Sequence, residues 1–256
     1  MKILEIVEKI AVEEPRIVSI VGAGISKASG MPTFRGEDGM WNNYSAMELA
    51  TPQAFAKDPQ LVWNWYKARM RILLKAKPND AHFALTKLEK AGLSLGIITQ
   101  NVDGLHELAG SKKIIEIHGR IRYARCTSCK HVQRWDKDEI VNERDSLLYC
   151  PNCEKSLLRP DVVWFGEPLD PSKSEMALDW LSHCNLVLVI GTSGVVYPVA
   201  SFPSFAKENG AKIIEFNIES TPLTPICDFS VFGKCEENLP LFVEELIRKI
   251  EKSKSG

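Results

Sequence analysis

The chain has 256 residues, and its 32 Lys and Arg against 33 Asp and Glu give a formal net charge of -1. At ~150 residues per domain, this length predicts one large domain or a domain with an insertion. The near-neutral charge argues against a protein that binds nucleic acid through a general basic field. No apolar run approaches the ~20 residues of a membrane helix. Glu5 and Glu8 interrupt the apolar start, which does not fit a signal peptide, so we expect a cytoplasmic protein with no membrane partner.

Short runs rich in Ile, Val and Leu are typical of strands buried on both faces of a parallel sheet. Helical patterns at residues 81–91 and 172–184 lie between some of them. This alternation predicts a doubly wound parallel α/β sheet. The expected strands are residues 17–21, 95–99, 114–117, 186–190 and 212–216.

Two segments interrupt the alternation, and we interpret both as insertions that form a smaller lobe. Residues 36–77 include a helical stretch rich in Trp, Tyr and Met, and residues 120–159 include paired cysteines. The predicted larger domain therefore comprises 1–35, 78–119 and 160–250. The smaller one comprises a helical module at 36–77 and a zinc-binding module at 120–159.

The ends of the expected strands carry small, polar or titratable residues. Ligands of open α/β sheets bind outside the carboxyl ends of the strands, so these ends together predict a ligand site. The segments that follow the strands in chain order are GAGIS, QNVD, HG, GTS and NIE.

The first of these segments resembles an incomplete dinucleotide-binding motif. Gly22 and Gly24 would let the backbone approach a phosphate at a helix start, but Lys27 stands where the third glycine of G-x-G-x-x-G belongs. An NAD-dependent dehydrogenase would also need an acidic residue after its second strand. Glu37 and Asp38 lie at about that distance with no strand before them, so this alternative is disfavoured.

Titratable and amide side chains at the strand ends are the catalytic candidates. His118 shares the expected edge with Asn101 and Asp103, and a histidine there can act as a general base. Alternatively, His118 has a structural role only, with its ring hydrogen-bonded to the backbone. Asp103 could likewise cap the helix that starts at Gly104. For Asp103, the capping role and a role in the site can both hold. The amide of Gln100 suits a carboxamide ligand.

Arg35 is a cation beside GAGIS that could contact a pyrophosphate, although a solvated loop charge is the alternative. Residues 191–193 offer a second phosphate cradle. His106 and His131 carry only structural interpretations.

Four cysteines form the pattern Cys126-x2-Cys129, twenty residues, Cys150-x2-Cys153. Four thiolates suit a structural zinc ion and leave no position for water or substrate. Two disulfides or four unrelated thiols are the alternatives. Acidic residues balance the basic ones between the pairs, which argues against a zinc module that binds nucleic acid.

The ordered set of motifs resembles the sirtuins, the NAD-dependent protein lysine deacylases. The set covers most of the chain. Its members are GAGIS at 22–26, GMPTFRG at 30–36, TQNVDGLH at 99–106, HG at 118–119, the cysteine pairs, VVWFGE at 162–167, GTSGVVYP at 191–198 and NIE at 217–219.

The resemblance implies a Rossmann-type larger domain, with an acyl-lysine peptide bound opposite NAD between this domain and the smaller lobe. The acyl oxygen would attack the ribose carbon that bears nicotinamide, and nicotinamide would leave. His118 would then activate a ribose hydroxyl, giving deacylated lysine and O-acyl-ADP-ribose. Protein mono-ADP-ribosyl transfer, which shares this cofactor chemistry, is the alternative function.

The resemblance also implies the binding residues. Asn101 and Asp103 would hold the ribose and the carboxamide, and Phe34 would shield the reacting centre. The acyl-lysine tunnel and its strand-like pairing with the peptide would use Val163, Trp164, Phe165 and Gly166. The implied NAD contacts are Gly22, Ala23, Gly24, Ser26, Thr33, Phe34, Arg35, Trp41, Gln100, Asn101, Val102, Asp103, Gly191, Thr192, Ser193, Asn217, Ile218, Glu219 and Cys235, the last standing where the family commonly has a small residue.

A helical pattern over 61–75 places Tyr66 and Arg69 on one apolar face. A buried guanidinium needs an anion, and Glu48 or Asp58 could supply it. In one sirtuin subclass, however, a Tyr-x-x-Arg on this helix binds the carboxylate of succinyl- or malonyl-lysine, to which the arginine fork is suited. We therefore expect removal of acidic acyl groups, with deacetylation also possible. The sequence is silent on oligomeric state.

Overall fold

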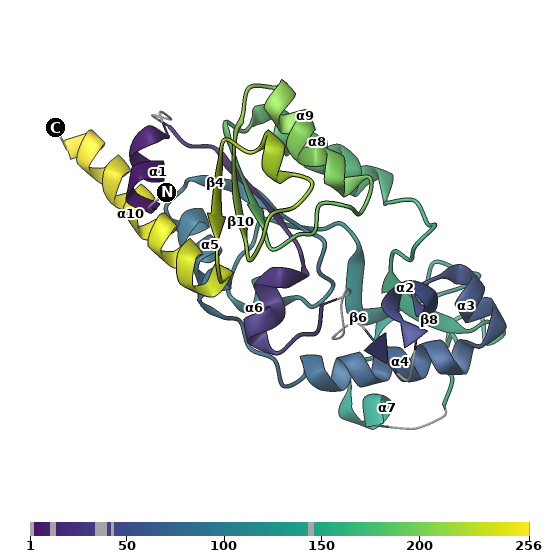
Figure 1. Cartoon of the computed structure of the whole chain (residues 1–256). Helices are drawn as coiled ribbons and strands as arrows, with labels where there is room; N and C mark the ends of the chain where they lie inside the picture. Colours follow the sequence, from purple (N-terminus) through teal and green to yellow (C-terminus); the bar gives the residue numbers. More distant parts are fainter. Residues whose placement is uncertain (1–2, 11–13, 34–39, 42–43, 143–145, 256) are drawn as a thin grey trace. The chain divides into compact units, whose positions relative to one another are not determined.

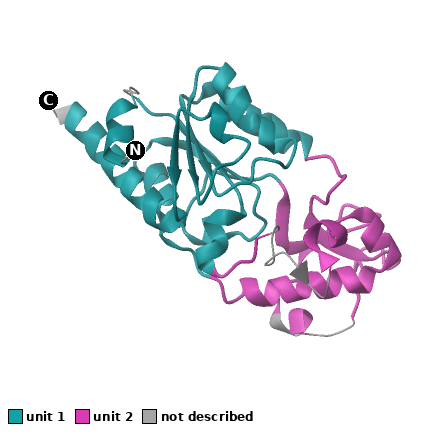
Figure 2. Cartoon of the chain, in the orientation of Figure 1, with its two compact units in different colours: residues 1–29, 77–117, 170–256 teal, residues 30–76, 118–169 magenta. Residues whose placement is uncertain are grey.

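The structure is a computed structural model, and it describes residues 3–10, 14–33, 40–41, 44–142 and 146–255 (Figure 1). The chain divides into two compact units (Figure 2). Unit 1 comprises Met1–Ser29, Lys77–Ile117 and Asp170–Gly256, and unit 2 comprises Gly30–Ala76 and His118–Leu169.

Unit 1 is built on a six-stranded parallel sheet with the order β11-β10-β9-β1-β4-β5. The predicted α/β fold is confirmed, and each expected strand is present. Sequence analysis missed the edge strand β11, whose FSVF is short, only partly buried and interrupted by Ser230. The strands are β1 (Ile17–Val21), β4 (Ser94–Thr99), β5 (Ile114–Glu116), β9 (Leu186–Ile190), β10 (Lys212–Asn217) and β11 (Phe229–Phe232).

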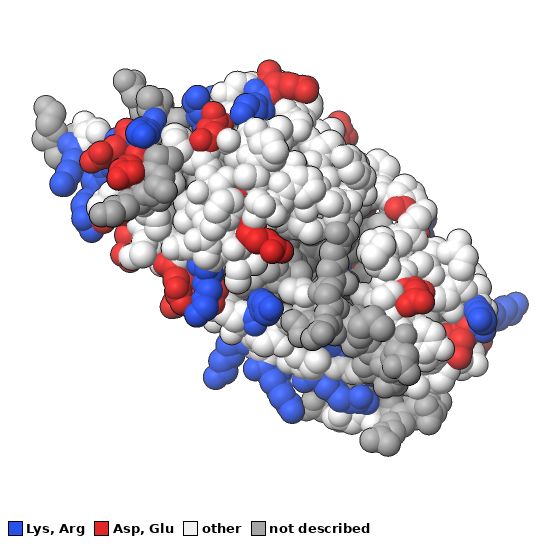
Figure 3. Space-filling view, viewed as in Figure 1, with Lys and Arg blue, Asp and Glu red and all other residues white. Residues whose placement is uncertain are grey.

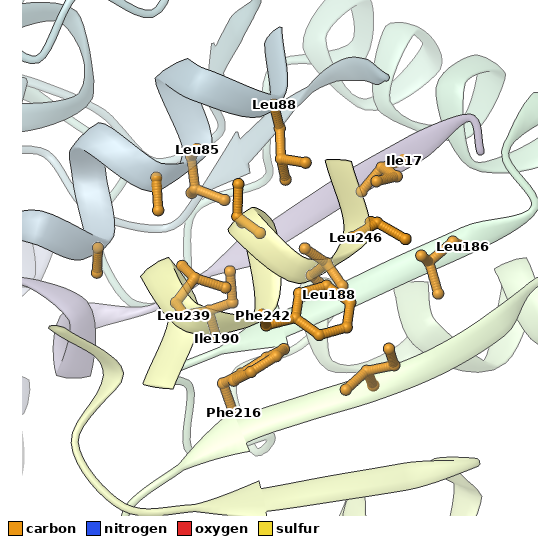
Figure 4. Close-up of a cluster of buried hydrophobic side chains, with 14 of the residues drawn as sticks. Ile17, Leu85, Leu88, Leu186, Leu188, Ile190, Phe216, Leu239, Phe242 and Leu246 are labelled. Carbon is orange, nitrogen blue, oxygen red and sulfur yellow. The ribbon is translucent and has the colours of Figure 1, made fainter. Parts of the chain in front are cut away.

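Helices cover both faces of this sheet (Figure 1). On one face α10 (Cys235–Ser255) packs against α5 (Asp80–Lys90) and α1 (Ile3–Lys9), and on the other α8 (Pro171–His183) packs against α9 (Phe202–Glu208). The helix α10 buries apolar residues at spacings of three and four, as an amphipathic helix should. They meet the strands in one core, drawn in Figure 4, that includes Ile17, Leu85, Leu88, Leu186, Leu188, Ile190, Phe216, Leu239, Phe242 and Leu246.

Shorter elements join these layers. In unit 1 they are the 3-10 helices η1 (Ala23–Ser29), η3 (Val199–Ser201) and η4 (Thr224–Ile226) and the helix α6 (Leu105–Leu108). Over the described ranges, no helix is both long enough and apolar enough to cross a membrane.

Unit 2 combines helices with a three-stranded antiparallel sheet of order β7-β6-β8. Its longest helix is α4 (Pro59–Leu73), which begins where the Asp58 carboxylate accepts from the backbone N–H of Leu61 at 2.9 Å. The other elements are β2 (Met40–Trp41), β3 (Tyr44–Ser45), α2 (Ala46–Leu49), α3 (Pro52–Lys57), β6 (Gly119–Cys126), β7 (Val132–Arg134), α7 (Asp138–Asn142) and β8 (Leu158–Val162).

The division into units differs from the sequence-based boundaries at 35/36, 77/78, 119/120 and 159/160. Three segments assigned from sequence to the larger domain belong to unit 2, namely the residues from Gly30 onward, the pair His118–Gly119, and residues 160–169. For the last two segments the physical reason is strand pairing, because β8 pairs with β6 from Gly119↔Val162 to Cys126↔Leu158.

Candidate functional site

A hydrogen-bonded cluster stands where β1 and β4 end in unit 1. The Ser26 hydroxyl donates to Asp103 Oδ2 at 2.8 Å. It also accepts from Asn101 Nδ2, 3.2 Å away, and this amide lies 3.1 Å from the carbonyl of Gly22. The other Asp103 oxygen accepts from the N–H of Leu105 at 2.9 Å, so the carboxylate both starts α6 and joins the cluster. All three side chains are buried, which fixes their positions.

The next layer of this cluster is a histidine that sequence analysis did not single out. His82 Nδ1 accepts from the backbone N–H of Asn79 at 3.3 Å, which leaves the ring proton on Nε2. That N–H faces the Ser26 oxygen at 3.4 Å. Burial lowers the pKa of His82 to about 4, so the ring is neutral near pH 7. The hydrogen bonds thus run in one direction, from Asn79 through His82 and Ser26 to Asp103.

His106 packs against His82, with ring centroids 4.8 Å apart. It is buried, and neither ring nitrogen has a hydrogen-bond partner among the described residues. Burial first, and then the neighbouring His82, hold the pKa of His106 well below its ordinary value. The structure therefore supports the structural interpretation of this residue.

The glycines of GAGIS allow two loops of unit 1 to touch. A Cβ on Gly22 would lie 2.7 Å from the Gly191 carbonyl oxygen, and one on Gly24 would lie 2.8 Å from the same atom. The N–H of Gly24 donates to that oxygen at 2.8 Å. Lys27, in the place of the third glycine, lies exposed in η1. A helix does start after β1, as expected, and it is a 3-10 helix in direct contact with the loop after β9.

Polar side chains link the remaining strand ends of unit 1. Gln100 Nε2 donates to the Thr192 hydroxyl at 2.9 Å, and Asn217 Nδ2 donates to the Thr192 carbonyl at 2.8 Å. The ends of β4, β9 and β10 are thus joined through Thr192. Beyond them, Ile218 is 67% exposed, whereas Cys235 is buried at the start of α10. Of the other implied NAD contacts in unit 1, Ala23, Val102 and Ser193 are half-buried and Glu219 is exposed.

The four paired cysteines of unit 2 converge. Their sulfur atoms all lie within 4.8 Å of one another, and the pairs Cys126–Cys153 and Cys129–Cys150 are each 3.7 Å apart. An ideal ZnS4 tetrahedron with bonds of ~2.3 Å has sulfur separations of about 3.8 Å. Disulfide sulfurs would be ~2.05 Å apart, so the disulfide alternative is wrong. The cluster is consistent with a structural zinc ion.

Backbone N–H groups near these cysteines favour the thiolate form, which is the form that binds a cation. The N–H groups of Ser128 and Cys129 point at Cys126 Sγ, each at 3.3 Å. The backbone of Lys155 lowers the pKa of Cys153 to about 6, whereas desolvation raises the pKa of Cys150 to about 11. Zinc would favour the thiolate of both. The nearby His131 hydrogen-bonds Gln133 at 3.0 Å, outside the cluster.

Tyr66 and Arg69 are both buried on α4, as the helical pattern predicted. The Tyr66 oxygen accepts from the indole N–H of Trp164 at 2.8 Å, and desolvation raises the pKa of Tyr66 well above its ordinary value. Arg69 Nη2 lies 3.4 Å from the carbonyl of Pro32. Glu48, considered from sequence as a partner of Arg69, closes the capping box of α2, and Asp58 caps α4.

The segment from Val163 to Gly166 already uses several backbone donors within unit 2. The N–H of Val163 donates to the His118 carbonyl at 2.8 Å, and that of Phe165 donates to the Ala50 carbonyl at 2.9 Å. The N–H of Trp164 donates to Glu167 at 2.9 Å. The expected strand addition can therefore not use these three N–H groups in this conformation. Gly166 is exposed, with a φ of 86°.

The remaining predicted site residues lie in unit 2 or outside the described residues. His118, next to Gly119, is half-buried in unit 2. Thr33 is half-buried in unit 2. Phe34 and Arg35 lie outside the described residues, and Trp41 is described only through its backbone in β2.

The arrangement of motifs and fold can be compared with known proteins. Residues 22–198 match the Sir2 family. The chain belongs to this family. Two Sir2 relatives are named NAD-dependent protein deacylases. That of Pyrococcus furiosus is 50% identical over 248 residues, covering 96% of this chain and 98% of the relative. That of Archaeoglobus fulgidus, deacylase 1, is 47% identical over 249 residues, with the same coverage of 96% and 98%.

Solved Sir2 structures share the fold over nearly the whole chain. A Sir2 homolog–NAD complex superposes with a TM-score of 0.87 at 45% identity, covering 97% of this chain and 94% of that one. A Sir2 complex with a deacetylated p53 peptide and 3'-O-acetyl ADP ribose has a TM-score of 0.82 at 32% identity, covering 97% and 98%.

Two features of this Sir2 protein were missed by sequence reasoning. His82 looks like any helix residue, and only its place three residues after Asn79, as in a capping box, gave a signal. The second is an ion pair of Arg159 with Glu167 beneath Trp164, in which the Arg159 Cζ lies 3.3 Å from the ring centroid. Sequence reasoning predicted neither β8, which carries Arg159, nor the turn after it that brings Glu167 back to this residue.

Proposed function

We propose that this Sir2 protein is an NAD-dependent protein lysine deacylase that releases nicotinamide and transfers the acyl group to ADP-ribose. The observation that carries the proposal is the buried Ser26–Asp103–Asn101 cluster at the sheet's carboxyl edge, in a chain 50% identical to a protein named NAD-dependent protein deacylase. Ligands of such sheets bind at this edge.

The proposed roles follow from the chemistry of each side chain. Asn101 and Asp103, held by Ser26 and oriented by His82, would accept from and donate to the ribose hydroxyls and the carboxamide. N–H groups of the loops at 22–26 and 191–193 would face the phosphates, other than those of Gly22, Gly24 and Gly191, which already donate to backbone carbonyls. His118 would take a proton from a ribose hydroxyl as a general base. Asn217, Ile218, Glu219 and Cys235 would lie on the adenosine side.

The zinc cluster would act structurally in this proposal, holding β6 and the segment at 150–153 together, because its four protein ligands leave no open coordination position. Acyl-lysine proteins or peptides are the proposed partners, with Val163, Trp164, Phe165 and Gly166 at the acyl-lysine. On the face shown in Figure 3, acidic and basic side chains both occur, which supports a partner other than nucleic acid. Seven free cysteines support a reducing compartment such as the cytoplasm.

The test is mass spectrometry of an acetyl-lysine peptide incubated with NAD. The wild type should give deacetylated peptide, nicotinamide and O-acetyl-ADP-ribose, and His118→Ala should lose most of this turnover. His131→Ala, a histidine beside the zinc cluster, is the matched control and should retain it. Full activity of His118→Ala would remove the proposed base. ADP-ribose attached to protein, without deacylation, would instead favour mono-ADP-ribosyl transfer.

We further propose that the enzyme removes acidic acyl groups such as succinyl and malonyl, in addition to acetyl. Tyr66 and Arg69 support this, because a buried hydroxyl and a buried guanidinium three residues apart on one helix suit a carboxylate. Arg69→Met should lower kcat/KM on a succinyl-lysine peptide far more than on the acetyl-lysine peptide of the same sequence. Arg71→Met is the control on the same helix, since Arg71 bonds the Val141 carbonyl at 2.8 Å. Equal losses on both peptides in Arg69→Met would contradict the carboxylate role.

A further inference from the structure

The phenol of Tyr66 has a hydrogen bond of known direction. Its oxygen lies 2.8 Å from Trp164 Nε1. The indole N–H can only donate, so the phenol oxygen must accept. The phenol's own proton must therefore point to another group. Within the part of the chain that the structure describes, Trp164 is the hydrogen-bond partner found for this hydroxyl.

This proton belongs to a buried and neutral hydroxyl. Tyr66 is 3% exposed, so water has little access to it. Its pKa is raised by desolvation, which keeps the proton on the oxygen at neutral pH. A buried donor without an acceptor is unfavourable, and a ligand acceptor placed there would relieve this cost.

The surroundings of the phenol favour an anionic acceptor. Arg69, three residues further along α4 and 6% exposed, is close enough to act electrostatically on Tyr66. Its Cζ lies 5.4 Å from the Trp65 ring centroid, against an apolar wall. A carboxylate between the two groups would accept from both, whereas an acetyl methyl group would accept from neither.

Trp164 itself is held from several sides. The Arg159 guanidinium stacks on its ring, and Arg159 also bonds Glu167 Oε2 at 2.8 Å. Glu167 accepts in turn from the Trp164 backbone N–H at 2.9 Å. Phe55 packs at 5.3 Å between ring centroids. The indole N–H is thereby fixed in place. It therefore determines the orientation of the Tyr66 hydroxyl, and the hydroxyl does not determine the position of the indole.

We propose that Trp164 is a specificity-determining residue of this enzyme, which fixes Tyr66 as a hydrogen-bond donor toward an anionic acyl group. It is a positioning residue for acyl selectivity, acting through Tyr66. The inference rests on the proposed removal of acidic acyl groups and names a residue that governs it.

The experiment measures kcat/KM on succinyl-lysine and acetyl-lysine peptides of one sequence, for the wild type, Trp164→Phe, Tyr66→Phe and the double variant. Trp164→Phe should lower the succinyl-to-acetyl ratio by about two- to tenfold, the range for one lost hydrogen bond. The double variant should have the ratio of Tyr66→Phe alone, because the two residues act through one bond. Trp63→Phe removes another indole donor of unit 2, the one that bonds the Leu158 carbonyl at 3.0 Å, and should leave the ratio unchanged.

If the wild type removes succinyl and Trp164→Phe has the same succinyl-to-acetyl ratio, the proposed role of Trp164 is overturned. The proposed removal of acidic acyl groups would still stand. A wild type that cannot remove succinyl overturns the proposed acidic acyl activity and this inference with it. Equal losses on both peptides assign Trp164 a structural role only. If Trp164→Phe does not fold, benzothienylalanine at this position keeps the indole shape without the N–H, and its ratio decides in the same way.

Discussion

Replacing Gly24 by alanine should push apart the loops that follow β1 and β9. The added Cβ would lie 2.8 Å from both the Cα and the carbonyl oxygen of Gly191. Non-bonded carbon atoms ordinarily stand ~3.5–4.0 Å apart. The obstacle is backbone, which has no rotamer to change, so the loops must separate by roughly 1 Å.

The expected cost follows from these contacts. Overpacking of this kind costs about 1–3 kcal/mol, and the reduced entropy of the unfolded chain returns about 0.4–1 kcal/mol. A net loss of ~1–2 kcal/mol should lower the thermal midpoint by about 2–8 °C for a protein of this size. The same loops carry proposed NAD contacts, so the dissociation constant for NAD should rise about tenfold, or ~1.4 kcal/mol. Thermal denaturation and calorimetric titration with NAD measure the two effects.

Gly96→Ala is the matched control for this substitution. Its Cβ would lie 2.1 Å from Cζ3 of Trp180, at the far end of a half-buried side chain on α8. Stability should fall, Trp180→Leu in the same chain should restore most of it, and NAD affinity should not change. Wild-type stability and NAD affinity in Gly24→Ala would refute the argument, as would an equal loss of NAD affinity in Gly96→Ala.

Three further predictions concern other buried groups. Glu215, fully buried in β10, accepts from the hydroxyls of Thr221, Thr224 and Ser230. Glu215→Leu leaves these donors unpaired and should lower the free energy of unfolding in urea by ~2–4 kcal/mol, with Glu215→Gln costing less; equal effects would argue against a hydrogen-bonding role. Removing zinc with a chelator should lower the thermal midpoint, and so should Cys150→Ser. Cys184→Ser, which changes a buried thiol outside the cluster, should lower it less. Metal analysis should find zinc lost after chelation and in Cys150→Ser, and retained in Cys184→Ser. The folded-state pKa of His82, about 4 against an ordinary 6.5, means that the unfolded chain binds more protons between these values. The free energy of unfolding should therefore fall by up to ~3 kcal/mol as the pH drops from about 6.5 to 4. When denaturation is measured at pH 7 and at pH 5, His82→Gln should lose less stability between the two pH values than the wild type. Equal losses would exclude His82 as the source.

Local patterns in the sequence were sufficient for much of this protein. Continuous branched apolar runs predicted the strands β1, β4, β5, β9 and β10, because a strand buried on both faces must be apolar at every position. The cysteine spacing predicted one metal cluster, because two short knuckles bring four thiolates within bonding range of a single ion. The helical period placed Arg69 on a buried face.

Only the tertiary structure decided which distant residues meet. Trp164 reaches Tyr66 across 98 positions of the chain, and Ser26 reaches Asp103 across 77. The contact of Gly24 with Gly191 likewise depends on β1 and β9 lying side by side. The sequence names the residue types that can donate, accept or make room. The partners of these residues and the directions of their hydrogen bonds follow from tertiary packing. Packing brings together segments that lie far apart in the chain, and local periodicity in the sequence does not reveal such contacts.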